Sequence, residues 1–313
     1  MHIVNFKIFC DLVDSESFSQ AARMNDITQS AVSQQLRSME KHFNVLIVDR
    51  SQKQFRLTRE GAKVLEFARE LLVRYETLLC DLQAMRKVLS GTIHVSTICS
   101  IGLHELPPYL KSFLLKFPSI NVKVEYRRSN LVYEDVLQRR ADIGLIAFPT
   151  PTRGLEIVPF VEDELILIAG KNHPLTKQKQ VGLNEIKENP FIGFEQDIPT
   201  RQATDKFFKE HKLGITPVME FDNVETVKRA VEIDAGIALV PAGAVEKDLG
   251  KTITRLNVEP ELCKNWTRPL AIVYRKNRTL TPAIEKFIKL LKNELTEEDE
   301  KSLNGEYDSE EQD

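Results

Sequence analysis

Hydrogen-bonding side chains gather on one face of a predicted helix near the start of the chain. The helix is expected to begin after Thr28, because threonine is a good N-terminal helix cap. Its apolar residues follow the spacing of one buried face, at Val32, Leu36, Met39 and Phe43. The other face carries amide, hydroxyl and guanidinium groups, from Gln29, Ser30, Ser33, Gln34 and Arg37. Side chains of these types and lengths read base edges in the major groove of DNA, whereas a surface helix with a polar outer face is the alternative interpretation.

The segments around this helix favour the DNA interpretation. A preceding helix carries the small residues Ala21 and Ala22, which permit the close crossing of a helix-turn-helix, and a break is expected at Asn25–Asp26. Residues 49–58 alternate basic and apolar side chains like a β-hairpin that brings together Arg50, Lys53 and Arg56. Such residues suit phosphate contacts beside a base-reading helix. Residues 1–60 hold eight Lys and Arg against seven Asp and Glu, so charge alone is a weak argument.

Several short motifs occur here together, in one order and at consistent spacing. They are Phe18-Ser-Gln-Ala-Ala22, Thr28-Gln-Ser-Ala-Val-Ser-Gln-Gln-Leu36, Glu40, Arg50 and Leu57-Thr-Arg-Glu-Gly61. With these motifs the chain resembles the LysR-type transcriptional regulators. Two departures, Ser30 in place of a usual proline and Val48 in place of a common phenylalanine, touch helix initiation and packing. The resemblance implies a winged helix-turn-helix whose DNA-contacting residues are Thr28, Gln29, Ser30, Ser33, Gln34 and Arg37, with Arg50, Lys53 and Arg56 on the wing.

A long connecting helix is predicted from about Arg59 to Leu89, a segment without proline. One apolar seam follows alternating steps of three and four, at Leu65, Ala68, Leu72, Tyr75, Leu79, Leu82, Arg86 and Leu89. A second stripe runs beside it, at Val64, Phe67, Leu71, Leu78, Met85 and Val88. We expect the second stripe to pack on the DNA-binding domain and the seam to meet a partner helix, with a core helix of one large domain as the alternative. The resemblance likewise implies a linker helix that dimerises the DNA-binding domains.

After Gly91 the pattern changes to alternating strands and helices. The first series predicts strands at 93–98, 121–126 and 143–147 and helices at 103–117 and 131–139. The second predicts strands at 191–194, 217–221 and 236–240 and helices at 200–211 and 224–233. A strand at 269–274 and a helix at 282–291 are expected to return to the first lobe. The predicted fold class is α/β: an N-terminal winged helix-turn-helix, a long dimerisation helix, and a two-lobed domain of parallel α/β units, of the periplasmic-binding-protein type.

These patterns also set the expected domain boundaries. The DNA-binding domain is placed at 1–58, the linker helix at 59–90 and the effector-binding domain at 91–293. Within the last, lobe I is expected at about 91–162 and 267–293, and lobe II at about 163–266. Residues 294–313 remain as an acidic tail.

Loops at the carboxyl ends of strands are where α/β sheets bind ligands. Here they are residues 98–102, 127–130, 195–201 and 222–223. Ser100 precedes one helix and Thr200 begins another, an arrangement that suits a small anionic ligand, while a simple capping role for each is the alternative. The resemblance continues through motifs such as Arg140-Ala-Asp-Ile-Gly144 and covers roughly residues 2–293. It implies an effector pocket lined by Ser100, Ile101, Ala147, Thr200, Arg201 and Asn223.

Composition excludes several other classes of protein. The 313 residues are 42% apolar and 28% charged, which is ordinary for one or two soluble domains, and they contain neither an apolar run of 18 nor an export signal. The four cysteines form no Cys-x-x-Cys pair, which favours reduced thiols in the cytoplasm. The six histidines show no metal-ligand spacing, and phosphate-loop, Gly-x-Gly-x-x-Gly, Gly-x-Ser-x-Gly and His-Glu-x-x-His motifs are absent. We therefore expect no catalytic residues, no cofactor and no metal.

The acidic final twenty residues offset a small net positive charge on the rest of the chain. They contain ten acidic residues and one lysine, a net charge of −9. Because the net charge of the whole chain is −3, residues 1–293 carry a net charge of +6. With so little apolar content this tail is predicted to be disordered. A solvating extension is the favoured role, over a brake on the basic wing or a partner-binding segment.

The sequence thus predicts a DNA-binding transcriptional regulator modulated by a small, anionic effector between two lobes. The expected partners are double-stranded DNA, the effector, other copies of the chain (a dimer through the linker helix, then a tetramer) and RNA polymerase, with no membrane. The alternative is a cytoplasmic binding protein or enzyme on the two-lobed fold without DNA binding.

Overall fold

The computed structural model describes residues 2–49, 55–84, 91–264, 266–276 and 280–296. The chain forms two compact units, Met1–Val88 and Leu89–Asp313. The predicted wing residues Arg50 and Lys53, the end of the predicted linker helix and most of the acidic tail lie outside the described residues.

Short helices and a small hairpin form the part of the first unit that precedes its long helix. They are α1 (Ile3–Ser15), α2 (Phe18–Met24), α3 (Gln29–Phe43), β1 (Val48–Asp49) and β2 (Arg56–Leu57), with β1 and β2 antiparallel. The Thr28 hydroxyl accepts a hydrogen bond from the Ala31 backbone N–H at 3.2 Å, so its predicted capping role is confirmed. Asp26, with φ at +53°, makes the predicted break between α2 and α3.

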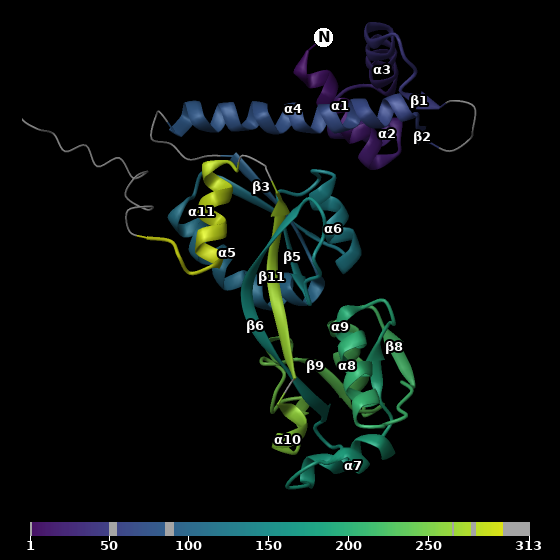
Figure 1. Ribbon diagram of the computed structural model, residues 1–313, viewed down its shortest axis with the longest axis vertical. Helices are drawn as coiled ribbons and strands as arrows, with labels where there is room; N and C mark the ends of the chain where they lie inside the picture. Colours follow the sequence, from purple (N-terminus) through teal and green to yellow (C-terminus); the bar gives the residue numbers. More distant parts are fainter. Residues whose placement is uncertain (1, 50–54, 85–90, 265, 277–279, 297–313) are drawn as a thin grey trace, which may run out of the picture. The chain divides into compact units, whose positions relative to one another are not determined.

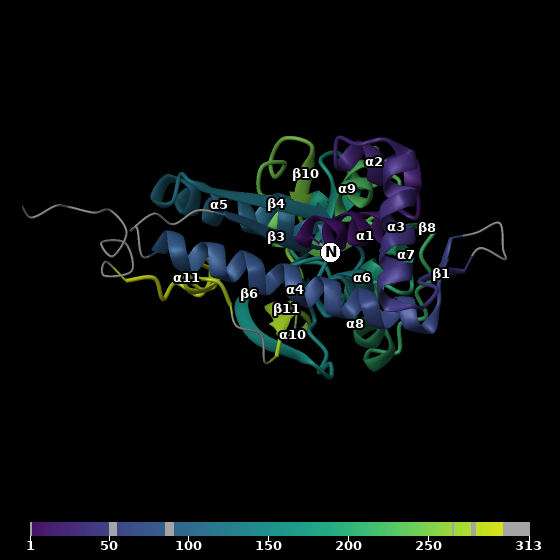
Figure 2. The ribbon, with the colours of Figure 1, turned by 90° about the horizontal axis from the view of Figure 1, so that it is seen from above.

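The long helix α4 (Arg59–Ala84) is unbroken in its described part (Figure 2). Its first half packs on the core of the first unit through Val64, Leu65, Ala68, Leu71 and Leu72. Its second half exposes a run of apolar side chains, at Tyr75, Leu78, Leu79 and Leu82. Most apolar side chains in the first half of α4 are therefore covered, with Phe67 exposed, and those described in the second half are exposed, because the three short helices contact only the first half. This corrects the assignment of Leu65, Ala68 and Leu72 to a seam left free for a partner.

Lobe I of the second unit has a sheet between two helical layers. Its elements are β3 (Gly91–Thr97), the π-helix η1 (Ile101–Glu105), α5 (Leu106–Lys116), β4 (Ile120–Tyr126), α6 (Ser129–Leu137), β5 (Ile143–Ala147) and α11 (Pro282–Leu291). β3 pairs in parallel with both β4 and β5. Phe113 of α5 and Phe287 of α11 pack on one face of the sheet, while Val132 and Val136 of α6 pack in a separate core. These layers place the start of α6 at the carboxyl ends of β3 and β4.

Lobe II repeats the arrangement on a smaller scale. It contains η2 (Pro174–Lys177), α7 (Leu183–Glu188), β7 (Ile192–Phe194), α8 (Pro199–Glu210), β8 (Met219–Phe221), α9 (Val224–Glu232), β9 (Ala238–Pro241), η3 (Ala242–Ala244), β10 (Ile253–Arg255) and α10 (Pro260–Cys263). β7 and β8 are parallel, and each leads into the start of a helix, α8 and α9 respectively.

Two long strands run through both lobes (Figure 1). β6 (Leu155–Gly170) pairs antiparallel with β11 (Thr267–Arg275), and its far end pairs with β9 and β10. The sequence analysis did not predict β6, because its pairing partners follow more than 60 residues later and its first half mixes Pro159 with acidic residues. The expected two-lobed α/β fold is confirmed. The expected parallel pairs are present, and β11 and β6 add antiparallel pairs that the sequence analysis did not predict.

No helix in the described part of the chain is both long and apolar enough to cross a membrane.

Candidate DNA-reading helix and effector cleft

The predicted DNA-reading side chains lie on the solvent side of the first unit. Thr28, Gln29, Ser30, Gln34 and Arg37 are exposed and Ser33 is half-buried, while Val32, Leu36 and Met39 on the other side of α3 are buried. Arg56 of β2 is exposed as well. Because α3 keeps the helical spacing throughout, these polar groups share one accessible face.

A buried carboxylate holds the wing against this helix. Glu40 is 8% exposed, and its Oε1 accepts hydrogen bonds from the backbone N–H groups of Ile47 and Val48, at 3.1 and 3.4 Å. The Thr58 hydroxyl donates to the Leu46 carbonyl at 2.6 Å and accepts from the Gly61 N–H at 2.8 Å. Glu40, Thr58 and Gly61 belong to the motifs singled out in the sequence, and their shared role is to join α3, the wing and the start of α4.

A buried ion pair between Arg69 and Asp14 joins α4 to α1. Arg69 is only 7% exposed. Beside it, burial raises the pKa of the Cys10 thiol to about 12, although the Arg69 charge acts in the other direction. Cys10 therefore stays protonated and acts as a small apolar core residue.

A cleft with a volume of about 450 Å³ opens between the two lobes. Lobe I contributes the end of β3, the start of α6 and the end of β5, and lobe II contributes the starts of α8 and α9. The backbone N–H groups of a first helical turn lack partners within the helix and carry partial positive charge. The starts of α6, α8, α9 and the π-helix η1 all border this cleft, which therefore favours an anionic group.

Four of the six predicted effector residues line the cleft. They are Ser100, Ala147, Thr200 and Asn223. Ile101 is fully buried in the core of lobe I. The Arg201 guanidinium is held by Asp205 at 2.7 Å, by Glu220 at 2.6 Å and by the Phe194 carbonyl at 2.7 Å. Neither Ile101 nor Arg201 lines the cleft. Ile101 is buried in the apolar core of lobe I, and Arg201 is hydrogen-bonded to the carboxylates of Asp205 and Glu220.

Helix capping was the alternative for Ser100 and Thr200, and the structure shows it for neither of them but for Asn223. Asn223 is a true cap, since its Oδ1 accepts from the Thr226 N–H at 3.1 Å. Thr200 is not, because α8 begins at Pro199. Ser100 makes no capping bond, and its hydroxyl instead accepts a hydrogen bond of 2.6 Å from Arg268.

Arg268 is the residue that the sequence analysis missed. It is 1% exposed, lies on β11 where the two lobes meet, and borders the cleft. Its Nη1 donates to Asp163 of β6 at 3.0 Å and its Nη2 to Ser100. Its Nε has no hydrogen-bond partner among the described residues. The signal in the sequence was weak, because Arg268 lies just before the apolar strand predicted at 269–274.

Two side chains of lobe I, Arg128 and His104, contact three carboxylates of lobe II. Arg128, just before α6, donates to Glu195 at 2.7 Å and to Asp197 at 2.9 Å. His104 of η1 contacts Glu225 of α9 at 2.7 Å. A ligand that binds Arg128 in place of Glu195 and Asp197 will remove a contact between the two lobes.

Carboxyl groups with raised pKa values lie beside Arg268. Burial raises the pKa of Asp163, and Arg268 only partly opposes that effect. Burial and the nearby Asp163 charge likewise raise the pKa of Glu105. The fold therefore favours the ionised form of each side chain less than water does.

Replacing Glu105 with glutamine will therefore raise the melting temperature at neutral pH. A raised native pKa means that wild-type stability declines as the pH increases through and above the ordinary range of a glutamate, and Glu105→Gln removes that decline. Thermal unfolding from pH 4 to pH 8 will show the two proteins converging at the acidic end. An equal difference at every pH would contradict the electrostatic explanation.

A helix-turn-helix unit followed by a long helix and a two-lobed domain with a ligand-sized cleft defines a ligand-responsive DNA-binding regulator. Residues 3–62 match the family described as bacterial regulatory helix-turn-helix protein, lysR family, and residues 86–296 match the LysR substrate binding domain. The chain belongs to the LysR family of transcriptional regulators. It is a DNA-binding regulator with an effector-binding domain, not an enzyme, so the alternative without DNA binding is set aside.

Relatives and solved structures agree over nearly the whole chain. The HTH-type transcriptional regulator CysL of Bacillus subtilis is 28% identical, over 92% of this chain and 95% of CysL. Full-length CbnR in complex with its target DNA is 18% identical, with a TM-score of 0.66 over 94% of this chain and all of that one. The effector-binding domain of QuiR in complex with shikimate is 18% identical, with a TM-score of 0.59 over 66% of this chain and 97% of that domain.

Proposed function

We propose that a small hydroxylated carboxylate controls this regulator by binding between lobes I and II. The observation that carries the proposal is the convergence of four helix starts on a cleft that also contains the buried, partly unpaired Arg268. The carboxylates of Asp197 and Asp222 border the same cleft and provide acceptors for ligand hydroxyl groups. The shikimate complex of QuiR, a structure of the same fold, supports this choice of chemistry.

The effector residues that we propose are Ser100, Ala147, Thr200 and Asn223, joined by Arg128 and Arg268. Replacing Thr200 with valine keeps the shape of the cleft wall and removes one hydroxyl. We expect this change to weaken binding of the effector about tenfold, the cost of one lost hydrogen bond. A thermal-shift screen of hydroxylated carboxylates, shikimate among them, identifies the ligand, and calorimetry compares the variants. Thr216→Val, an exposed change outside the cleft, is the control. Equal weakening in both variants would contradict the assignment.

DNA recognition is proposed for Thr28, Gln29, Ser30, Ser33, Gln34 and Arg37 on α3, with Arg50, Lys53 and Arg56 contacting phosphates. We expect Arg37→Ala to weaken operator binding by about 10- to 100-fold, because one side-chain contact to a base edge contributes about 1–3 kcal/mol. The measurement is a footprint on DNA upstream of the chain's own gene, over a salt series. Arg153→Ala removes the same charge from an exposed turn of the second unit and serves as the control. Similar losses of operator affinity in both variants would mean that Arg37 contributes only non-specific electrostatic attraction to DNA.

Self-association is proposed through the exposed apolar half of α4, where Tyr75, Leu79 and Leu82 would pack against the same helix of a second copy of the chain. A dimer so formed, and a tetramer of two dimers, would carry several DNA-binding units. Effector binding would reposition the lobes and, through α4, the spacing of those units on DNA. An effector that binds but leaves the footprint and the DNA bend unchanged would contradict this coupling. The cytoplasm is the proposed location, with RNA polymerase as a further partner at the promoter.

A further inference from the structure

We propose a second ligand site, for an uncharged or cationic aromatic molecule, in a cavity beside the effector cleft. This cavity has a volume of about 830 Å³ and lies between the lobes. Lobe I contributes α6 and the end of β5, and lobe II contributes one face of α8 together with β9 and α10. The proposal is independent of the effector assigned to the first cleft.

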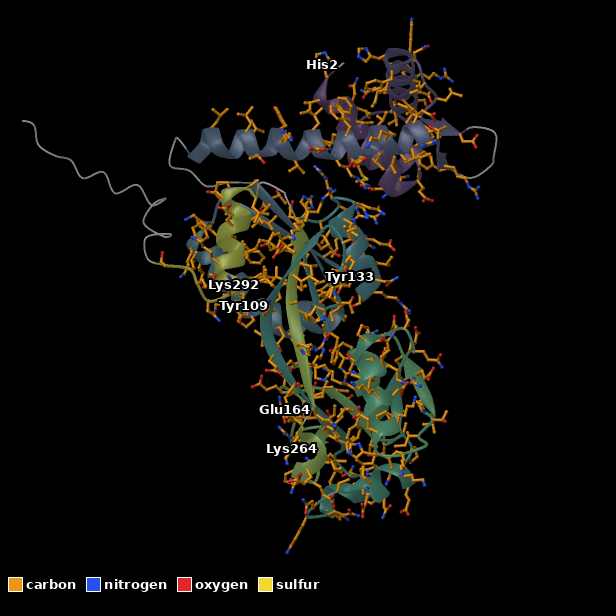
Figure 3. All side chains as sticks on the ribbon, in the orientation of Figure 1. His2, Tyr109, Tyr133, Glu164, Lys264 and Lys292 are labelled. Carbon is orange, nitrogen blue, oxygen red and sulfur yellow. The ribbon has the colours of Figure 1, made fainter. Side chains whose placement is uncertain are left out.

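Five aromatic side chains line this second cavity. Tyr133 of α6, labelled in Figure 3, and Phe148 come from lobe I. Phe207, His211 and Trp266 come from lobe II. The Phe207 ring lies 5.2 Å from that of Trp266 at 82° and 4.3 Å from that of His211 at 42°. Walls of ring faces and edges set at steep angles suit a planar aromatic ligand, which adds further stacked or edge-to-face contacts.

The wall also holds an unused hydrogen-bond donor. Trp266 is 5% exposed, and its indole Nε1 is buried with no hydrogen-bond partner among the described residues. A buried donor without a partner is unfavourable, and an indole N–H can only donate. A shift of the wall that exposes this N–H would let a ligand with an acceptor next to its ring, such as an amide or ring carbonyl oxygen, accept a hydrogen bond from it.

Charge distinguishes the second cavity from the effector cleft. Its lining includes one lysine, Lys206, against three carboxylates, Asp197, Glu210 and Glu261. The effector cleft instead includes three arginines, at positions 127, 128 and 268, against two carboxylates, Asp197 and Asp222. It also borders four helix starts, of which only those of α6 and α8 border the second cavity. An anion is thus disfavoured in the second cavity by the same Coulomb interactions that favour it in the first.

The two sites share part of one wall. Ser129, Asn130, Ala147, Asp197 and Pro199 border both. These residues are the start of α6, the end of β5 and the start of α8 with its preceding loop, so they come from both lobes. An aromatic molecule in the second cavity would contact the segments that must move when the effector cleft closes.

The single tryptophan of the chain makes this site directly measurable. Because Trp266 is the only tryptophan, fluorescence excited at the red edge of indole absorption reports on one side chain of this cavity wall. Trp266 also borders a smaller cavity of about 230 Å³, which Ala203 does not line, so substitution of Ala203 distinguishes the two. The probes are benzamide, benzylamine and benzoate, which share one ring and differ in charge. We expect a saturable fluorescence change with benzamide and benzylamine, with dissociation constants on the order of 1 mM for molecules this small. Benzoate is expected to bind about fivefold more weakly.

Two variants of one helix test the location. Ala203 lines the cavity and is half-buried on α8, so Ala203→Phe fills the cavity and should abolish the saturable change. Lys209→Phe places the same side chain on an exposed position of α8 that does not line the cavity, and should leave binding intact. No saturable change with benzamide in the wild-type chain, or equal binding by Ala203→Phe, would overturn the proposal. Binding lost in Thr200→Val but kept in Ala203→Phe would assign the probe to the effector cleft and overturn it as well.

Discussion

Replacing Arg268 with methionine will lower the free energy of unfolding by about 3–5 kcal/mol, the usual cost of breaking a buried ion pair from one side. The change leaves Asp163, which is 8% exposed, without its cationic partner at the crossing of β6 and β11. Chemical denaturation at pH 7 measures the loss. The deficit should shrink toward acidic pH, because the pKa of Asp163 is already raised and its protonated form needs no cation.

A double variant separates the lost charge from lost packing. Asp163→Asn keeps an acceptor for the nearby backbone N–H groups and removes the charge. Arg268→Met combined with Asp163→Asn should recover much of the stability, since the buried charge is then absent. If the double variant is as unstable as Arg268→Met alone, packing of the arginine and not its charge is responsible. Both variants should also respond poorly to the effector, because Ser100 loses the donor that positions its hydroxyl.

Replacing Gly61 with alanine will destabilise the first unit and weaken DNA binding together. An added Cβ would lie 2.0 Å from the Ile47 carbonyl oxygen, so the start of α4 must move away from the wing. Inside an open helix the same change stabilises by about 1 kcal/mol, because alanine has the higher helix propensity. We expect a net loss of about 1–3 kcal/mol from overpacking, measured by thermal unfolding, with a parallel loss of operator affinity.

The control for Gly61 is a glycine with free space around it. An added Cβ at Gly214 would meet no heavy atom within 4 Å, so Gly214→Ala should change neither stability nor DNA binding. Unchanged or increased stability in Gly61→Ala would mean that the α4–wing contact yields easily and is not needed for the fold.

Local periodicity was sufficient for most of the elements that position the two sites. The bounds of β5 and α11 match the predicted residues 143–147 and 282–291, and the polar face of α3 was evident from helical spacing alone. Such features depend on neighbours three or four residues apart, which one sequence displays directly. The capping of α3 by Thr28 is local for the same reason.

Tertiary structure decided what depends on distant neighbours. β6 forms because β11, β9 and β10 supply its hydrogen bonds. Whether an apolar side chain of α4 is covered or exposed depends on how far the three short helices extend along that helix. The same holds for the cleft: Arg201 and Arg268 look alike in sequence, yet Glu220 and Asp205 hold the first away from the cleft. Only the crossing of β6 and β11 brings Arg268 to Ser100, a residue 168 positions away in the chain. The sequence by itself thus determined the fold class and the exposed polar face of α3, because their signals are local periodicities. The composition of the effector cleft was decided by the tertiary structure, because a charged side chain goes where distant partners compensate its burial.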